Sequence, residues 1–415
     1  MIIEFSIGNY RSVKEIQTLS MEAANLVSKF KEIDIQNVHS INDKWSLLKS
    51  KAIYGANASG KSNLISGLKA FINIVNLSVK DDGILNSEVE NFLLDDEYDD
   101  KPTFFQLMFL VDDVFYRYGF EATNEKIVSE WLFGTPGKKE VPFFVRETTG
   151  IEINDKQFSE ASKLKQLVRD NSLFLTVVKS LNGKIAEKII EFISRIVVVS
   201  GLSDRRLFAH AGAFLDNNDQ KEKMVAMLKI ADVGIEDVVR VDIEEEDVPD
   251  IGSSRKRSFI VTTHKRLEGK NRDKVDAPLS FDAHESEGSK KMFELSPIIL
   301  SAIENCYPLI LDEFDARFHP LLSRKLVEFF NSESNTKKTQ FVFATHDTNL
   351  LDASLLRRDQ ICFAEKDKDG ASHFYTLAEF KGVRNDASFE KDYIRGKYGA
   401  IPFIGDFNTI FESHA

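Results

Sequence analysis

One segment of the chain has the residue types and spacing of a phosphate-binding loop. Residues 55–62 read GANASGKS and fit G-x-x-x-x-G-K-[ST] without a mismatch. The glycines let backbone N–H groups turn toward phosphate oxygens, Lys61 reaches the terminal phosphates, and the Ser62 hydroxyl suits Mg²⁺. A glycine-rich turn with a surface lysine is the alternative, which the flanking strand and helix patterns disfavour. We expect nucleotide contacts from the whole loop and the residue after it: Gly55, Ala56, Asn57, Ala58, Ser59, Gly60, Lys61, Ser62 and Asn63.

Two adjacent acids follow an apolar segment far downstream. The predicted strand at residues 309–311 delivers Asp312 and Glu313 at its end, where open α/β sheets place ligand groups. Asp312 could hold the metal, directly or through water, and Glu313 could orient and deprotonate the attacking water. Adjacent acids at a strand end are usually a plain turn, but together with a phosphate loop they indicate catalysis.

A histidine ends the next apolar segment. Residues 341–345 read FVFAT and lead into His346, which could contact the γ-phosphate and hold Glu313 or the water in position. Taken alone, such a histidine is more often structural. Its place after the acid pair favours a catalytic role.

A fourth segment could bind an anion at the start of a helix. Residues 285–291 read ESEGSKK and precede apolar residues at helical spacing. Free N–H groups and the positive end of the helix dipole would allow Ser286, Gly288 and Ser289 to contact phosphate. Serine and glycine are also ordinary N-cap residues, so this segment is weak evidence on its own.

In this order the four segments resemble the ABC ATPase superfamily, with residues 286–289 at its signature and His346 at its switch histidine. The resemblance implies ATP and Mg²⁺ as cofactors, ATP hydrolysis, and a homodimer or higher homo-oligomer. In its composite sites, the signature of one subunit closes over the γ-phosphate held by the other. The implied fold is α/β, an ABC-type P-loop ATPase head with a mixed sheet, an antiparallel β subdomain and a helical insertion.

Six stretches resemble the RecF/SMC-like branch, and within it the single-headed AAA ATPases of the overcoming-lysogenisation-defect group in bacterial phage defence (RloA/AbiL-like). They are NYRS (residues 9–12), GANASGKSN, ESEGSKK, LILDEFDARFHP, FATHDTNLL and YIRGKYGAIP. The 225 residues from Lys61 to Ser286 exceed the compact layout of a transporter subunit. Gln106 is a candidate for the glutamine loop, but its neighbours alternate as in a strand, which is the favoured interpretation.

The resemblance also bears on partners. Many members of the wider group append a nuclease domain, and the 69 residues that follow His346 are too few for one. A separate effector protein, a nuclease or a toxin, is therefore expected.

The elements that must position these residues follow from apolar spacing. We predict a hairpin from residues 2–10 and 15–21, a strand at 47–54, a helix at 64–75, antiparallel strands over 104–145 and helices over 156–231. The expected organisation is an N-terminal part of the head with the P-loop lobe and β subdomain (1–150), a mainly helical insertion (151–240) and a C-terminal part of the head (241–415).

Composition restricts the class of protein. The chain has 415 residues, 42% of them hydrophobic, and a net charge of -12. No apolar run approaches the roughly 20 residues that cross a bilayer, and the first residues lack the layout of a signal peptide. We expect a globular, cytoplasmic protein without a membrane segment, in which Cys306 and Cys362 are free thiols.

One basic patch interrupts the acidic chain. Residues 251–275 hold eight Lys or Arg against Glu268 and Asp273. The patch could bind nucleic acid, or it could be a solvated hairpin tip, with candidate contacts at Arg255, Lys256, Arg257, Lys265 and Arg266. Three functions stay open: an ATPase that gates or senses for an effector in anti-phage defence, a RecF-like DNA-repair ATPase that clamps DNA directly, and a nucleotide-bound scaffold that hydrolyses ATP slowly.

Overall fold

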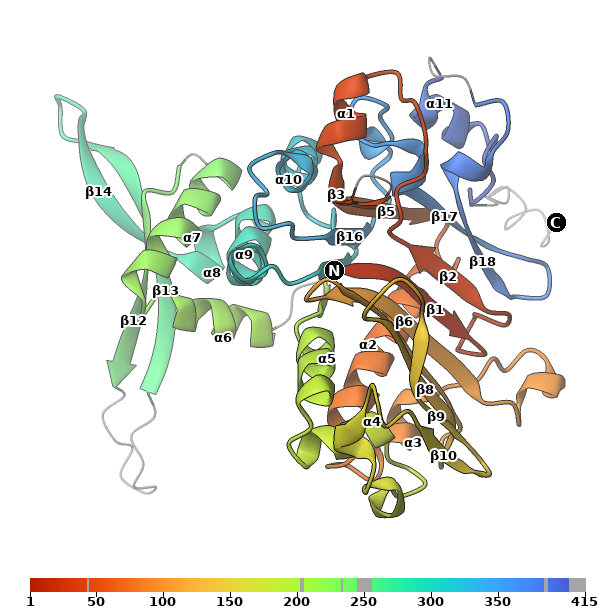
Figure 1. The fold of residues 1–415 in the computed structure, drawn as a ribbon. Coiled ribbons are helices and arrows are strands. Elements are labelled where there is room, and N and C mark those ends of the chain that lie inside the picture. Colours follow the sequence, from red (N-terminus) through yellow and green to blue (C-terminus); the bar gives the residue numbers. More distant parts are fainter. Residues whose placement is uncertain (43–44, 202–204, 233, 245–255, 384–386, 403–415) are drawn as a thin grey trace, which may run out of the picture.

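A computed structural model describes residues 1–42, 45–201, 205–232, 234–244, 256–383 and 387–402. Two large sheets, a three-stranded arm and covering helices make up this part of the chain (Figure 1). The arm consists of β12 (Asp237–Glu244), β13 (Lys256–Glu268) and β14 (Asp273–Ser280), and it projects to the left of Figure 1, away from both large sheets.

The first large sheet is antiparallel, with strand order β10-β9-β8-β7-β6-β1-β2. Its strands carry the β-branched and aromatic residues that favour a pleated, half-buried surface. They are β1 (Ile2–Gly8), β2 (Gln17–Ser20), β6 (Thr103–Val111), β7 (Val114–Ala122), β8 (Ile127–Thr135), β9 (Val141–Glu147) and β10 (Gly150–Ile153). The predicted hairpin and the predicted antiparallel strands are confirmed.

The second large sheet is mixed, with strand order β11-β15-β16-β5-β17-β18. The first five strands are parallel, and β18 closes the edge antiparallel to β17. The strands are β5 (Ser50–Gly55), β11 (Val197–Ser200), β15 (Leu309–Asp312), β16 (Phe341–Ala344), β17 (Ile361–Lys366) and β18 (Ser372–Thr376). A short hairpin of β3 (Val38–Asn42) and β4 (Trp45–Leu48) precedes β5.

Helices cover both sheets and join the arm to them (Figure 1). The described helices are α1 (Lys31–Gln36), α2 (Lys61–Leu77), α3 (Ile84–Glu88), α4 (Phe174–Ser180), α5 (Lys184–Ser194), α6 (Arg205–Phe214), α7 (Asn218–Ala231), α8 (Phe281–His284), α9 (Glu287–Asn305), α10 (Pro320–Asn331) and α11 (Phe389–Ile394). The fold is thus α/β with one mixed and one antiparallel sheet, as predicted.

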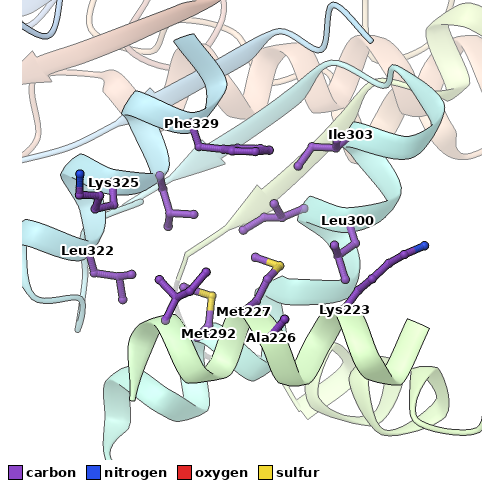
Figure 2. Close-up of a pocket in the computed structure, with 12 residues that line it drawn as sticks. Lys223, Ala226, Met227, Met292, Leu300, Ile303, Leu322, Lys325 and Phe329 are labelled. Atoms are coloured by element: carbon purple, nitrogen blue, oxygen red, sulfur yellow. The ribbon is translucent and has the colours of Figure 1, made fainter. Parts of the chain in front are cut away.

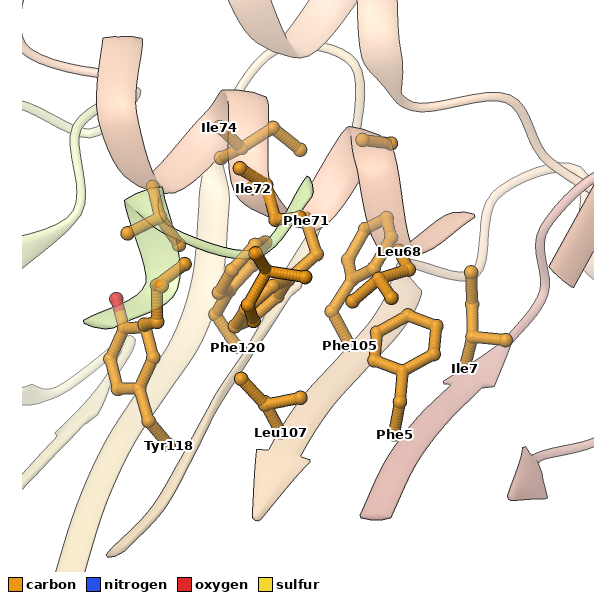
Figure 3. Close-up of a cluster of buried hydrophobic side chains, with 14 of the residues drawn as sticks. Phe5, Ile7, Leu68, Phe71, Ile72, Ile74, Phe105, Leu107, Tyr118 and Phe120 are labelled. Atoms are coloured by element: carbon orange, nitrogen blue, oxygen red, sulfur yellow. The ribbon is translucent and has the colours of Figure 1, made fainter. Parts of the chain in front are cut away.

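Helix α2 is held against the antiparallel sheet by aromatic side chains. The Phe71 ring stacks on Phe120 with centroids 5.6 Å apart and packs near Phe105 (Figure 3). Each buried Phe contributes about 1.5–3 kcal/mol. Gly67 allows this close approach, since a Cβ there would lie 2.2 Å from Ile7 Cδ1. The packing fixes the direction in which the first turn of α2 points.

The stretch predicted as a helical insertion is divided between two hydrophobic cores. Helices α4 and α5 pack in the core of the antiparallel sheet, whereas α6 and α7 pack in the core that contains α9. Between these helices lies β11, which pairs parallel to β15. The sequence analysis did not predict β11. The domain boundaries themselves stay a prediction.

Candidate nucleotide-binding site

The phosphate loop (residues 55–62) connects β5 to α2, in the strand, loop, helix order that the sequence predicts. Gly60 lies just before α2 with φ 104°, and a Cβ there would lie 2.1 Å from Ser372 Oγ. A Cβ on Gly55 would lie 2.3 Å from the carbonyl oxygen of Ala364. Strands β17 and β18 therefore support the back of the loop so closely that both positions require glycine.

Lys61 folds back over the loop. Its ammonium donates to the carbonyl oxygens of Gly55 at 2.8 Å and Ala56 at 3.0 Å, and the residue is 7% exposed. Burial lowers the pKa of Lys61, and three carboxylates oppose that shift: Asp312, Glu313 and Asp315. Two of these three, Asp312 and Glu313, are groups that the sequence assigns to the same site as Lys61.

Ser59 supplies an independent sign of a ligand. Its hydroxyl is buried and has no hydrogen-bond partner among the described residues. A buried polar atom is normally paired, so this one fits a phosphate oxygen at the loop. Ser62, at the first turn of α2, is exposed.

The strand register brings the other predicted residues to the loop. In the parallel sheet Leu311 pairs with Phe343, and Phe343 pairs with Ala52. All three strands therefore end at the same edge, where Asp312, His346 and Gly55 lie. Because β16 lies between β15 and β5, His346 sits between the acid pair and the phosphate loop.

The acid pair begins a tight turn. Glu313 has φ 50°, and its N–H donates to Asp312 Oδ1 at 3.1 Å. Burial lowers the pKa of His346, and the positive charge of Lys61 lowers it further, so the imidazole is neutral at neutral pH. A neutral ring can accept a hydrogen bond as well as donate one.

Asp315 is an acid at this site that the sequence analysis did not single out. Its carboxylate accepts a hydrogen bond from the main-chain N–H of His346, and it opposes the pKa shifts of both Lys61 and His346. The available signal was its place in LDEFDARFHP, two residues after Glu313.

The signature turn (residues 286–289) starts helix α9. Ser286 caps the helix, with its Oγ 3.1 Å from the Ser289 N–H. The Ser289 hydroxyl donates to Asp232 at 3.0 Å, and Glu285 pairs with His264 of the arm at 2.7 Å. The turn is therefore braced by α7 and the arm, and its predicted contact with a second subunit stays a prediction.

Two other features from the sequence analysis, Gln106 and the basic patch, lie away from the sheet edge that carries the phosphate loop. Gln106 lies within β6 and accepts a hydrogen bond from the Trp131 indole at 3.1 Å, which agrees with the strand interpretation. In the basic patch, Lys265 pairs with Asp276, and Arg266 pairs with Glu268. Arg255 and the side chains of Lys256 and Arg257 lie outside the described residues.

An apolar groove of about 430 Å³ lies between α7, α9 and α10 (Figure 2). Met227, Met292 and Phe329 line it, with the lysines Lys223 and Lys325 at its ends. Both lysines are paired with acids. The groove has no phosphate-binding character and is separate from the site at the sheet edge.

The family comparison bears directly on these residues. Residues 52–352 match the family described as "AAA domain, putative AbiEii toxin, Type IV TA system". The chain belongs to this family. The matched region begins within β5 and includes the phosphate loop, the signature turn, the acid pair and His346. The chain therefore carries an ATP-binding P-loop ATPase domain.

No curated protein matches the chain. Solved structures that are similar include the SMC head domain from Thermotoga maritima, with 13% identity over 90% of this chain and 98% of that chain and a TM-score of 0.43. An SmcHead bound to the C-winged helix domain of ScpA has 13% identity over 90% and 97%, with a TM-score of 0.42. The Smc head domain with an extended coiled coil, bound to the C-terminal domain of ScpA derived from Pyrococcus furiosus, has 12% identity over 95% and 98%, with a TM-score of 0.39. At this level of similarity they add no argument about function.

Among the described residues, no helix is long and apolar enough to span a membrane.

Proposed function

We propose that this chain hydrolyses ATP, and that ATP binding closes a head-to-tail dimer that gates a separate effector in RloA/AbiL-like anti-phage defence. The observation that carries the proposal is the meeting of Lys61, the acid pair and His346 at one sheet edge. The family description, which names a putative toxin of a type IV TA system, supports the defence setting.

In this proposal the phosphate loop holds the phosphates of ATP. Lys61 exchanges its two carbonyl partners for phosphate oxygens, and the unpaired Ser59 hydroxyl gains one. Ser62 and Asp312 would hold Mg²⁺, which would neutralise negative charge on the phosphates. The described residues contain no group of three or more metal-ligating His, Cys, Asp or Glu side chains. Mg²⁺ usually takes one or two carboxylates and completes its shell with phosphate and water, so Ser62 and Asp312 suffice as its protein ligands in this proposal.

Glu313 and His346 carry the proposed chemistry. Glu313 accepts the proton of the attacking water. Neutral His346 donates a hydrogen bond from its ring N–H to a γ-phosphate oxygen and keeps the attacking water in line. Positioning and electrostatics supply most of the catalysis in phosphoryl transfer, so we expect both the spacing of these groups and the charge of the Glu313 carboxylate to matter.

The signature turn completes the site of a second copy of the chain. Ser286, Gly288 and Ser289 begin a helix of 19 residues, whose positive end attracts phosphate. This is the reason for proposing a dimer with two composite sites.

A trapping experiment tests the proposed function. Glu313→Gln keeps the size and polarity of the side chain but removes the base, so ATP should remain bound and a stable dimer should accumulate in light scattering. Glu125→Gln, in the turn between β7 and β8, is the matched control and should turn over normally. Normal turnover in Glu313→Gln would remove this residue from catalysis.

The effector is tested by copurification. Products of adjacent genes should co-elute with the Glu313→Gln protein in the presence of ATP and separate from it without ATP. Tight, ATP-dependent DNA binding in the absence of any partner would instead favour the RecF-like function. The pairing of Lys265 and Arg266 with acids leaves less free positive charge on the arm for that alternative.

A further inference from the structure

Helix α9 is tied to the turn that follows β15 by a buried lysine. Lys291 is 1% exposed, and its ammonium donates to the carbonyl oxygens of Glu313 at 3.2 Å, Phe314 at 2.7 Å and Ala316 at 2.6 Å. All three ammonium hydrogens are thus directed at one short turn, residues 313–317, which we call the linking turn. The ammonium also lies 4.6 Å from the centroid of the Phe318 ring.

The burial of this charge is unfavourable by itself. In the described part of the chain, the hydrogen-bond partners of Lys291 are main-chain carbonyls, not carboxylates. Burial lowers the pKa of Lys291 to about 8, while the charges of Asp315 and Glu313 raise it and that of Arg317 lowers it. An apolar side chain would avoid this desolvation. The gain from the lysine is therefore geometric: it holds three carbonyl groups at fixed positions.

A second contact joins the same two elements. Glu287, in the first turn of α9, pairs with Arg317 at 2.7 Å. A Cβ on Gly288 would lie 3.1 Å from the Arg317 carbonyl oxygen. The signature turn and the linking turn of one chain therefore touch directly, and a shift of α9 along its axis would move both contacts.

The linking turn also constrains the sheet edge at which Glu313 and His346 lie. Glu313 and Arg317 have φ values of 50° and 69°, a region that non-glycine residues occupy only when their surroundings hold them there. The Phe314 N–H donates to the Ala344 carbonyl oxygen at 3.0 Å, two residues before His346. Holding the Glu313 carbonyl therefore constrains the main chain from which its carboxylate projects.

We propose that Lys291 is a positioning residue that ties the signature helix of a chain to Glu313 of the same chain. The inference rests on the proposed function, in which that signature faces ATP held by the other subunit. Closure of the signature on one ATP then sets the geometry of Glu313 at the second site. Lys291 couples the two composite sites and touches neither nucleotide.

Lys291→Met tests the positioning role, since it keeps the length and removes the donors. ATP affinity, measured by calorimetry, should stay near the wild-type value, whereas kcat should fall by about 100-fold, the order expected when catalytic groups shift by about 1 Å. Lys291→Arg keeps charge and donors and should recover part of the rate. Lys325→Met, which removes an exposed lysine of α10, is the matched control. Wild-type kcat in Lys291→Met would overturn the proposal.

Mixed dimers separate the two directions of coupling. In a dimer of one chain with an intact phosphate loop and one Lys61→Ala chain, a single composite site remains. Lys291→Met should lower its hydrolysis about 100-fold when placed in the chain that supplies Glu313. Placed in the chain that supplies the signature, it should leave hydrolysis at the level of the same mixed dimer with Lys291 intact. The reverse result would assign Lys291 to the shape of the signature turn and overturn the proposal.

A failure of the proposed function would give a different result from a failure of the Lys291 proposal. If the chain forms no ATP-dependent dimer, dimer gating fails, yet the kcat of Lys291→Met still reports on Glu313. If Lys291→Met does not fold, Lys291→Gln keeps a polar head with fewer donors and is measured in the same way. Wild-type kcat in that variant would count against the inference.

Discussion

The carboxylate of Asp315 accepts a hydrogen bond from the main-chain N–H of His346, with 3.3 Å between Oδ1 and N. This contact joins the linking turn after β15 to the end of β16. It therefore fixes the separation between the acid pair and the histidine, which come from different strands. Together with Lys291, Asp315 makes the turn a junction between the signature helix and the catalytic edge.

Asp315→Ala should lower the rate of hydrolysis and leave ATP binding nearly unchanged. The His346 main chain loses its acceptor, so the imidazole moves relative to Glu313, and we expect a loss of roughly 10-fold in kcat. Asp315→Asn keeps an acceptor without the charge and should retain most of the activity. Steady-state hydrolysis measures kcat, and calorimetry measures the affinity for ATP. An equal loss of kcat in Asp315→Ala and Asp315→Asn would assign the effect to the charge of Asp315.

Lys61→Ala should weaken nucleotide binding itself. Hydrogen bonds from a charged donor contribute about 1.5–3 kcal/mol, which corresponds to an affinity loss of roughly 10- to 100-fold. Lys69→Ala, on an exposed position of the same helix, controls for the loss of a lysine from α2. A calorimetric titration with wild-type affinity in Lys61→Ala would contradict the assignment of the phosphate loop.

Gly60→Ala should destabilise the loop before any ligand is present. The residue has φ 104°, and the added Cβ would overlap Ser372 Oγ. Strain of this kind costs about 1–3 kcal/mol and should appear as a lower midpoint of thermal unfolding with weaker ATP binding. Gly137→Ala, whose Cβ meets no atom within 4 Å, is the control. Equal midpoints for both variants would show that β18 yields to the side chain.

His39 should make the protein less stable in mild acid. It is 4% exposed, and burial, followed by the charge of Lys49, lowers its pKa from 6.5 to about 3. Below about pH 6.5 the unfolded chain binds a proton that the folded chain refuses, so the free energy of unfolding falls as the pH falls. Between about pH 7 and pH 5 this amounts to about 2 kcal/mol.

The comparison with His39→Gln isolates this effect from other titrating groups. Urea unfolding at both pH values should show a steeper loss of stability in the wild type than in the variant. Parallel losses would mean that the folded protein accepts the proton on His39.

The sequence predicts the parts of the site that depend on local pattern. The phosphate loop follows a strand and precedes an amphipathic helix, and the acid pair and His346 follow apolar segments, so parallel pairing suffices to bring them together. Lys291 had no such signal, because it stands in a run of two lysines and its burial depends on a turn more than 20 residues away. Strand β11 is as short as β15 and β16, but it directly follows residues at helical spacing, so its apolar run reads as part of the helices. Both features arise from tertiary packing.

Ser286→Asp should separate ATP binding from dimerisation. Aspartate caps a helix about as well as serine, so α9 should stay folded, while the added negative charge would face the phosphates bound by the other subunit. We expect normal ATP affinity but no ATP-dependent dimer and no hydrolysis. Ser388→Asp is the matched control, since Ser388 caps α11 in the same way, by accepting from the Lys391 N–H, and it should behave as the wild type.

Mixing the inactive Ser286→Asp and Lys61→Ala chains completes the argument. One composite site in the mixed dimer then has an intact phosphate loop from the first chain and an intact signature from the second. Hydrolysis should return to about half of the wild-type value if the two sites act independently, and to less if Lys291 couples them. Complete absence of activity in the mixture, with both chains folded, would mean that the signature turn serves the ATP site of its own chain.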